Sequence, residues 1–134
     1  MRPGLGWLAL ALAACAASCG GEQGPVAGEL AVRLVTPRAT DRAVAFFVVG
    51  RQHGVTVASS STYRLFSTSS AAGDTTWITI VAPKAGGLAA GELARIAVDD
   101  TRRAGSYLVR LSDVAAADYG VGDTAGVSLR VVRP

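Results

Sequence analysis

Two cysteines are the side chains whose placement most clearly indicates covalent chemistry in this sequence. Cys15 and Cys19 follow a basic start, Met1-Arg2, and an apolar run over residues 5–14. A short charged start, an apolar run and small residues before a cleavage point are typical of a secretory signal. The pattern predicts an exported protein that begins, after cleavage, with a cysteine.

The motif Leu12-Ala13-Ala14-Cys15 resembles the lipobox of bacterial lipoproteins. The resemblance implies cleavage before Cys15 and a diacylglycerol on its thiol, usually with a third acyl chain on the amine. Cys19 is the alternative acylation site. Leu12 suits the position three before the cysteine better than Ala16 does, which favours Cys15, whereas the short signal that Cys15 implies favours Cys19.

The apolar run at the start is too short to cross a bilayer, because a spanning helix needs about 20 residues. We therefore expect three segments: a signal peptide over residues 1–14, a lipidated cysteine with a Gly-rich flexible spacer over residues 15–28, and one folded domain over residues 29–134. Both cysteines precede that domain, so its fold has to be stable without an internal disulfide or a Cys-based metal site.

A period of two dominates the rest of the chain and predicts β-strands. Apolar residues alternate with arginine, serine or threonine, and Gly, Pro, Ser and Asp separate the runs. The expected strands cover residues 30–34, 43–49, 55–57, 63–66, 75–81, 93–98, 107–111 and 127–131. The continuous apolar run 43–49 predicts a strand buried on both faces, and residues 113–118 are the one candidate helix. The fold class expected is all-β: a single antiparallel β-sandwich of about eight strands.

The segment Gly91-Glu92-Leu93-Ala94-Arg95-Ile96-Ala97-Val98 looks like a strand of the cohesin-like sandwiches. In that family a further strand and a final Gly-x-x-x-Val strand follow, here residues 107–111 and 126–132. The resemblance implies a cohesin-like topology over residues 30–132, and another immunoglobulin-like sandwich is the alternative. It carries no partner-contacting residue onto this sequence.

Catalytic machinery is not evident, and the sequence predicts a protein without enzymatic activity or cofactor. His53 is the sole histidine and follows Gly50-Arg51-Gln52 in an expected turn, and no Gly-x-Ser-x-Gly motif is present. Nucleophilic catalysis needs a base beside its nucleophile. Phosphate loops, dinucleotide fingerprints and zinc-ligand spacings are also missing from the sequence.

Two small groups remain as candidate binding residues. Asp113, Asp118 and Asp123 precede the last strand and could supply three carboxylates to calcium, although turn formation explains them equally well. Trp77 and Tyr63, if both face outward, could form an aromatic platform for a sugar or a protein. We expect no metal site, and the sequence identifies no ligand.

The net charge of +3 comes from scattered arginines and gives no basic patch, which argues against nucleic acid as a partner. The expected function is therefore a membrane-anchored binding or assembly module of a bacterial cell envelope, with a protein or polysaccharide partner. A structural accessory subunit of an envelope complex is the alternative, and a hydrolase of unfamiliar type is the remaining one. The expected location is an envelope membrane, with the outer membrane or cell surface preferred.

Overall fold

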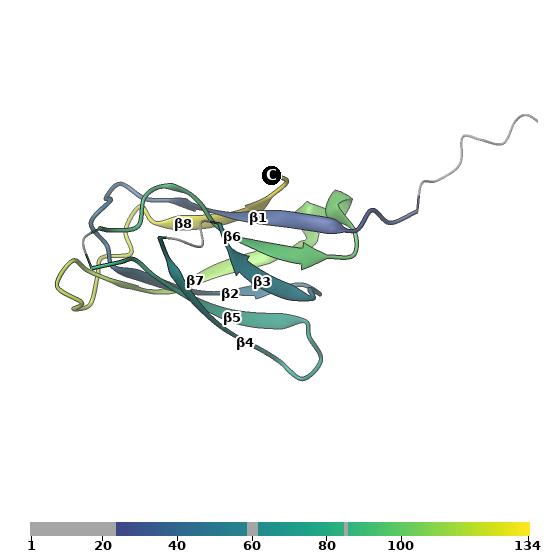
Figure 1. Cartoon of the computed structure of the whole chain (residues 1–134), viewed down its shortest axis with the longest axis horizontal. Helices are drawn as coiled ribbons and strands as arrows, with labels where there is room; N and C mark the ends of the chain where they lie inside the picture. Colours follow the sequence, from purple (N-terminus) through teal and green to yellow (C-terminus); the bar gives the residue numbers. More distant parts are fainter. Residues whose placement is uncertain (1–23, 59–61, 85) are drawn as a thin grey trace, which may run out of the picture.

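The computed structural model describes residues 24–58, 62–84 and 86–134 and shows an all-β protein built from two packed sheets (Figure 1). The predicted single antiparallel β-sandwich of eight strands is confirmed. Cys15, Cys19, the signal peptide and most of the expected spacer lie outside the described residues. The elements in chain order are β1 (Gly28–Val35), β2 (Ala43–Val49), β3 (Gly54–Val57), β4 (Arg64–Ser69), β5 (Thr75–Val81), β6 (Gly91–Val98), the 3-10 helix η2 (Thr101–Ser106), β7 (Leu108–Ala115) and β8 (Ser128–Val132).

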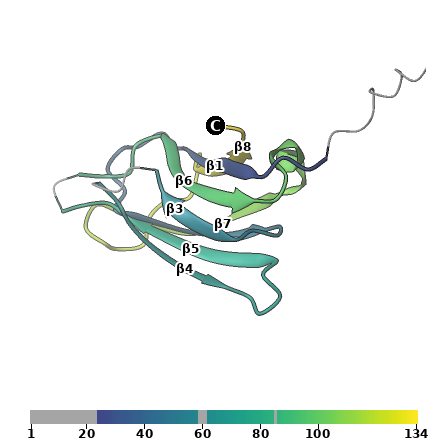
Figure 2. The same cartoon turned by 45° about the vertical axis from the view of Figure 1, so that its right-hand side comes forward.

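The strands divide into two four-stranded sheets. Sheet A has the order β3-β6-β1-β8 and sheet B has the order β4-β5-β2-β7, and neighbouring strands are antiparallel. The two layers are visible edge-on in Figure 1 and, turned, in Figure 2. The chain passes between the sheets at every connection except β4–β5, so neither sheet can form without the other.

The core lies between the inner faces of the sheets because alternate residues of each strand point toward the other sheet and most of these are apolar. On β5 the residues Thr76, Ile78 and Ile80 point inward and are buried, as their spacing predicted, while Trp77 points outward. Phe46 of β2 is 1% exposed and lies in the same cluster. The other fully buried large side chains are Leu30, Val32, Val44, Val48, Leu88, Leu93, Ile96 and Val98.

The strand β2 differs from its prediction, because it is buried on one face only. Val44, Phe46 and Val48 point into the core, whereas Phe47 is half-buried and Val49 is exposed on the outer side. The prediction of burial on both faces was wrong because sheet B has no layer covering its outer surface among the described residues. The apolar run of β2 therefore places hydrophobic side chains in contact with solvent.

Two further local differences concern short helices. The candidate helix at residues 113–118 is wrong at its start, since Asp113 to Ala115 continue β7 after a bulge and pair with β2. A 3-10 helix occurs instead at η2, where the Asp100 carboxylate accepts the Arg102 N–H and caps the first turn. Aspartate is a favoured capping residue because its side chain satisfies an N–H that the helix leaves unpaired.

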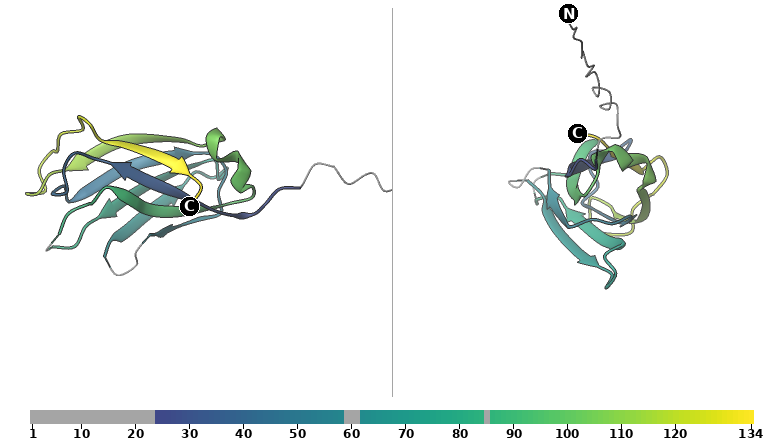
Figure 3. Two further views of the ribbon diagram at one scale, coloured as in Figure 1. Left: turned by 90° about the horizontal axis from the view of Figure 1, so that it is seen from above. Right: turned by 90° about the vertical axis from the view of Figure 1, so that its right-hand side faces the viewer.

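The ends of the sandwich carry different segments, as Figure 3 shows. The described chain enters β1 at the end that holds η2, and β8 runs back to this same end. The loop between β7 and β8, residues 116–127, lies at the opposite end. Strands of four to eight residues separate the two ends.

Candidate functional site

The outer face of sheet B is the candidate functional site, and we call it the sheet B face. It gathers exposed hydrophobic side chains from all four strands of the sheet: Val49, Phe66, Trp77 and Leu108, together with half-buried Phe47. Trp77 is 51% exposed and Phe66 is 59% exposed. A monomeric protein rarely leaves a contiguous apolar surface of this kind uncovered unless the surface binds something.

Strand register sets the order of these side chains in rows across the sheet. One row runs Thr68, Trp77, Phe47 and Arg110, because Trp77 pairs with both Thr68 and Phe47 and Phe47 pairs with Arg110. Cross-strand neighbours have Cβ atoms about 4.5–5.5 Å apart, so the two rings are direct neighbours.

The next row runs Phe66, Thr79, Ala45 and Asp113. Its two central residues are small, so the surface is lower here than at the Trp77 row. A third row, closer to the β7–β8 loop, continues the small central side chains with Ala43 on β2. The sheet B face therefore projects at the row of Trp77 and Phe47 and is hollowed at the neighbouring rows, which have Ala45 and Ala43 on β2.

Tyr119 borders this hollowed part from the β7–β8 loop. Its backbone φ is 67°, in the left-handed region that side-chain-bearing residues seldom adopt. Two backbone bonds close the turn around it, from the Tyr119 N–H to the Ala116 carbonyl and from the Ala116 N–H to the Gly120 carbonyl, each 2.8 Å. The turn holds an exposed tyrosine ring beside the sheet at the expense of backbone strain, and strained residues cluster at functional sites.

Arg42 fixes the position of that ring. Its guanidinium carbon lies 5.7 Å from the centre of the Tyr119 ring, within the range of a cation–π contact. Its Nε donates to the Ala117 carbonyl at 3.1 Å, and its terminal nitrogen donates to the Lys84 carbonyl at 2.7 Å. One side chain thus ties the β5–β6 and β7–β8 loops together under Tyr119.

Two hollows open on either side of Tyr119. The smaller, with a volume of about 230 Å³, has Ala43, Ala45 and Thr79 on its floor and Tyr119 and Val121 on its wall. The larger, about 520 Å³, lies between Tyr119 and residues 62–64 and 81–84. Both hollows are open to solvent, so they can receive side chains of a partner that covers the surface.

Charged groups on the sheet B face are few and mostly basic. Arg64 and Arg110 are exposed at the β4 and β7 edges, and Asp113 is the acidic residue in the rows. Protein–protein interfaces are enriched in aromatic residues and arginine and depleted in lysine and glutamate. The side chains of the sheet B face have this composition.

The two predicted platform residues occupy different environments. Trp77 faces outward on the sheet B face, whereas Tyr63 precedes β4 and packs against the core. The Tyr63 hydroxyl accepts the Ala89 N–H at 3.3 Å. The structure therefore places beside Trp77 not Tyr63 but Phe47, its cross-strand neighbour.

The three aspartates considered for calcium each accept a hydrogen bond from a nearby backbone N–H group. Asp113, Asp118 and Asp123 accept the backbone N–H groups of Val114, Gly120 and Ala125 respectively, each at 2.9 Å. Within the described residues, no group of three His, Cys, Asp or Glu side chains is arranged to hold a metal ion.

His53 lies in an exposed loop before β3. Its Nε2 is 2.6 Å from Asp99 Oδ1, and the pair is open to solvent, with side chains 54% and 68% exposed. No serine, threonine or cysteine among the described residues hydrogen-bonds to the His53 ring. The pair has the base and the orienting carboxylate of a triad without a nucleophile in place.

Phe47, Phe66 and Tyr119 belong to the site but were not singled out from the sequence. The alternation over residues 75–81 placed Trp77 on the face opposite Ile78, yet only the strand order brings Phe47 beside Trp77. No sequence signal marks Tyr119, because nothing local distinguishes a tyrosine held in a left-handed turn from one in an ordinary loop.

Comparisons of the chain with protein-family models, with curated proteins and with solved structures find no match. The lipobox and the cohesin-like topology therefore stay predictions. In the described part of the chain, no helix has the length and apolar character needed to cross a bilayer.

Proposed function

We propose that this protein is a lipid-anchored, non-enzymatic binding module of a bacterial cell envelope, and that it binds a protein partner through the sheet B face. The observation that carries the proposal is the row of Trp77, Phe47 and their neighbours on a sheet surface that nothing in the described chain covers.

The apolar character of the face supports binding because its exposure has a cost. Each exposed apolar side chain loses about 25 cal/mol per Å² that its burial would contribute. Large aromatic side chains dominate interface energetics, and Trp, Tyr and Arg are enriched among the few residues that carry most of the binding energy. Trp77 and Phe47, with Arg110 at the end of their row, match that pattern.

The lipid anchor rests on the residues that precede the described chain. The lipobox resemblance at residues 12–15 supplies the acylated cysteine, and the residues between Cys15 and Val26, part of the spacer predicted over residues 15–28, join it to the domain. An anchored module with one unpartnered face can hold a soluble or membrane partner at the envelope without catalysing any reaction.

Matched variants on the two sheets test the partner surface. Leu108 on sheet B and Val35 on sheet A are both 47% exposed, so Leu108→Thr and Val35→Thr remove comparable exposed apolar groups. The full-length tagged protein is recovered from native membranes in mild detergent, and co-purified proteins are quantified for wild type, the two variants and Trp77→Thr.

We expect one protein to co-purify with wild type and Val35→Thr and to be lost with Trp77→Thr and Leu108→Thr. Equal recovery with all four proteins would contradict the proposal. If wild type co-sediments with purified envelope polysaccharide and the same two variants do not, the partner is a polysaccharide and not a protein.

The anchor is tested by metabolic labelling with palmitate in wild type, Cys15→Ala and Cys19→Ala. We expect label in wild type and Cys19→Ala only. Label lost in Cys19→Ala and kept in Cys15→Ala would move the acylation site, and no label in any of the three would contradict lipidation.

The accessory-subunit alternative differs in stoichiometry. A structural subunit co-purifies in fixed ratio with a complex that falls apart when the protein is deleted, whereas a binding module exchanges with its partner. Quantitative mass spectrometry of the purified complex, with and without the protein, separates the two.

A further inference from the structure

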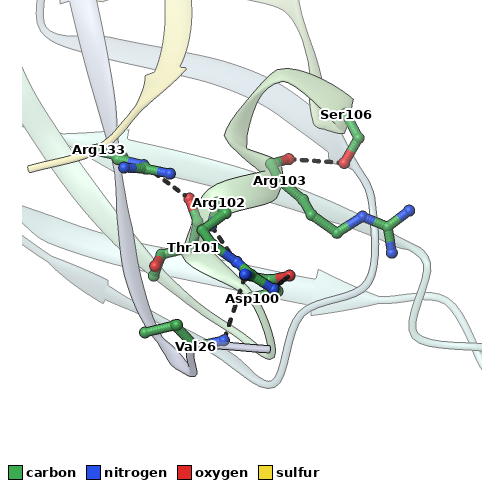
Figure 4. Close-up of polar contacts among 7 residues, drawn as sticks. All are labelled: Val26, Asp100, Thr101, Arg102, Arg103, Ser106 and Arg133. Carbon is green, nitrogen blue, oxygen red and sulfur yellow. Dashed lines mark hydrogen bonds and ion pairs between the residues drawn. The ribbon is translucent and has the colours of Figure 1, made fainter. Parts of the chain in front are cut away.

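The end of the sandwich at η2 holds the segment that leads in from the N-terminal side. The Val26 N–H donates to Asp100 Oδ1 at 3.3 Å, and the Thr101 N–H donates to the Val26 carbonyl at 2.8 Å (Figure 4). The Thr101 carbonyl in turn accepts from Arg133 Nε at 3.2 Å, which fastens the chain after β8 to the same helix. The position of Val26 against η2 is therefore fixed by hydrogen bonds.

Beside η2 lies a hollow of about 370 Å³. Its charged and polar lining consists of Arg51, Asp99, Asp100, Arg103, Ser106 and Tyr107. Tyr107 closes it on one side, because the Tyr107 hydroxyl donates to the Arg51 carbonyl at 2.5 Å. Burial, and after it the nearby Asp99, raises the pKa of Tyr107, so the phenol stays an uncharged donor at neutral pH.

The two acidic groups of the hollow already have partners. Asp100 accepts Arg102 Nε at 2.9 Å as well as two backbone N–H groups, and the hydrogen bonds from Arg102 hold the pKa of that carboxyl well below its usual range. Asp99 is paired with His53 at 2.6 Å.

The two arginines of the hollow have no such partner. Among residues 24–58, 62–84 and 86–134, neither the Arg51 nor the Arg103 guanidinium forms an ion pair or hydrogen bond. In Figure 4 the Arg103 side chain extends away from the Asp100–Arg102 pair. This end of the domain therefore presents two guanidinium groups that form no ion pair within the described residues, beside Asp100, which is paired with Arg102, and Asp99, which is hydrogen-bonded to His53.

Chain length places this end close to any N-terminal lipid. Cys15 lies eleven residues before Val26 and Cys19 lies seven before it. At about 3.5 Å per extended residue these tethers reach at most about 38 Å and 25 Å. The β7–β8 loop with Tyr119 lies a strand length further away, because β1 and β7 run between the two ends. For either cysteine, the tether therefore joins the domain at the η2 end and limits how far this end can lie from the lipid.

Building on the lipid anchor of the proposed function, we infer that the η2 end faces the membrane and that Arg51 and Arg103 bind the phosphate groups of anionic phospholipids. Guanidinium groups suit phosphate because their N–H fork matches two phosphate oxygens. Basic residues near an anionic surface each strengthen binding about five-fold. The contact orients the domain with the loops around Tyr119 pointing away from the bilayer.

Hydrogen exchange on the full-length lipidated protein tests the inference. The protein is reconstituted in vesicles of phosphatidylcholine alone and of phosphatidylcholine with about one-third phosphatidylglycerol. Exchange is followed by mass spectrometry over residues 99–107, with residues 116–122 as the internal reference. We expect exchange over residues 99–107 to slow about ten-fold on the anionic vesicles only, with no change at the reference.

Charge-matched double variants assign the effect to residues. Arg51→Gln with Arg103→Gln should remove the slowing, whereas Arg64→Gln with Arg110→Gln removes the same charge from the sheet B face and should keep it. Thermal unfolding of both variants checks that the fold is intact. Loss of the effect in both doubles, or equal slowing on neutral vesicles, would overturn the inference.

Inorganic phosphate in solution distinguishes binding of lipid headgroups from binding of free phosphate. Inorganic phosphate added to the protein in neutral vesicles should leave residues 99–107 unchanged, and slowing by phosphate alone would make the hollow an anion pocket and overturn the membrane assignment.

Mass spectrometry of the purified protein tests the lipid anchor separately, because a protein without the anchor would lack the added mass of the acyl chains. In that case flotation of the unlipidated protein with anionic vesicles, lost in Arg51→Gln with Arg103→Gln, would keep the headgroup contact without the anchor. Flotation unaffected by that double variant would overturn it.

Discussion

The outer faces of the two sheets belong to one small sandwich and use opposite chemistry. On sheet A, Arg95 lies over Ala31 between two carboxylates, with its Nε 2.5 Å from Glu92 Oε1 and its NH1 3.7 Å from Glu29 Oε1. On sheet B the corresponding surface carries Trp77, Phe47 and small side chains.

Sheet A shields its surface with side chains that interact with one another and with water. Ala31 is 0% exposed although it points outward, because Arg95 and its neighbours cover it. Long arginine stems cover apolar surface while their charges stay hydrated. Sheet B lacks such cover, so its hydrophobic side chains are free to meet a partner. In both sheets, successive side chains point alternately into the core and toward solvent. The two outer faces therefore differ only in the chemical type of the side chains that point toward solvent.

The largest expected effect is a difference in the free energy of unfolding between variants at two neighbouring residues of β2, Phe46 and Phe47. Phe46→Ala should lower the free energy of unfolding by about 3–5 kcal/mol, because it empties a fully buried site. Phe47→Ala, on the outer side, should cost clearly less and should instead weaken partner recovery. Urea unfolding of both variants measures the difference. Equal destabilisation would mean that the sheet B face is part of the folded core.

The next effect concerns association of the protein with itself. Trp77→Thr combined with Phe66→Thr should raise solubility and reduce concentration-dependent association, because both side chains are more than half exposed. Val35→Thr on sheet A should change neither. Sedimentation velocity over a range of concentrations, with and without ammonium sulfate, measures it. Sulfate strengthens apolar association, so its effect should be lost in the double variant.

Tyr119 offers a test in which stability and binding separate. Tyr119→Gly relieves a left-handed backbone that costs about 1–2 kcal/mol for a side-chain-bearing residue. The gain is offset by the flexibility of glycine in the unfolded chain and by the lost contact with Arg42. We expect a nearly unchanged melting temperature with reduced partner recovery. A large loss of stability would show that the ring serves the fold.

Asp100, at the η2 end of the sandwich, gives a smaller effect that depends on pH. The pKa of Asp100 is lowered in the folded protein, so its ionised form stabilises the fold above the ordinary carboxyl pKa of about 3.9. That stabilisation is lost as pH falls through the lowered folded value. Asp100→Asn should therefore melt below wild type at neutral pH, with a gap that closes only below about pH 4. Melting temperatures over a pH series measure it, and a constant gap would contradict the assignment.

The smallest effect is expected at Arg95. Arg95→Gln should lower the melting temperature slightly at low salt and not at high salt, because exposed ion pairs are weak and screened. A loss as large as that of Phe46→Ala would mean that covering Ala31 matters more than the charges do. Thermal unfolding at two salt concentrations decides this.

Much of the fold could be predicted from the sequence because period-two alternation is a local property. The outward direction of Trp77 and the inward direction of Ile78 follow from their neighbours alone. The prediction for β2 failed because seven apolar residues in a row carry no alternation, and which face is covered depends on the other strands. The Asp-capped helix η2 was missed because Asp100 and Arg102 also suit an ordinary turn.

The sequence by itself determined the number of strands, the inward sides of alternating strands such as β5 and the pattern on which the predicted N-terminal anchor depends, since each is written in adjacent residues. Tertiary structure alone decided that Trp77 and Phe47 are neighbours, that Tyr63 supports the core, and that Val26 is held on η2. These contacts join segments thirty or more residues apart or depend on which sheet a strand enters. Strand order and sheet packing are set by the burial of the whole core, so no local stretch of sequence could have specified them.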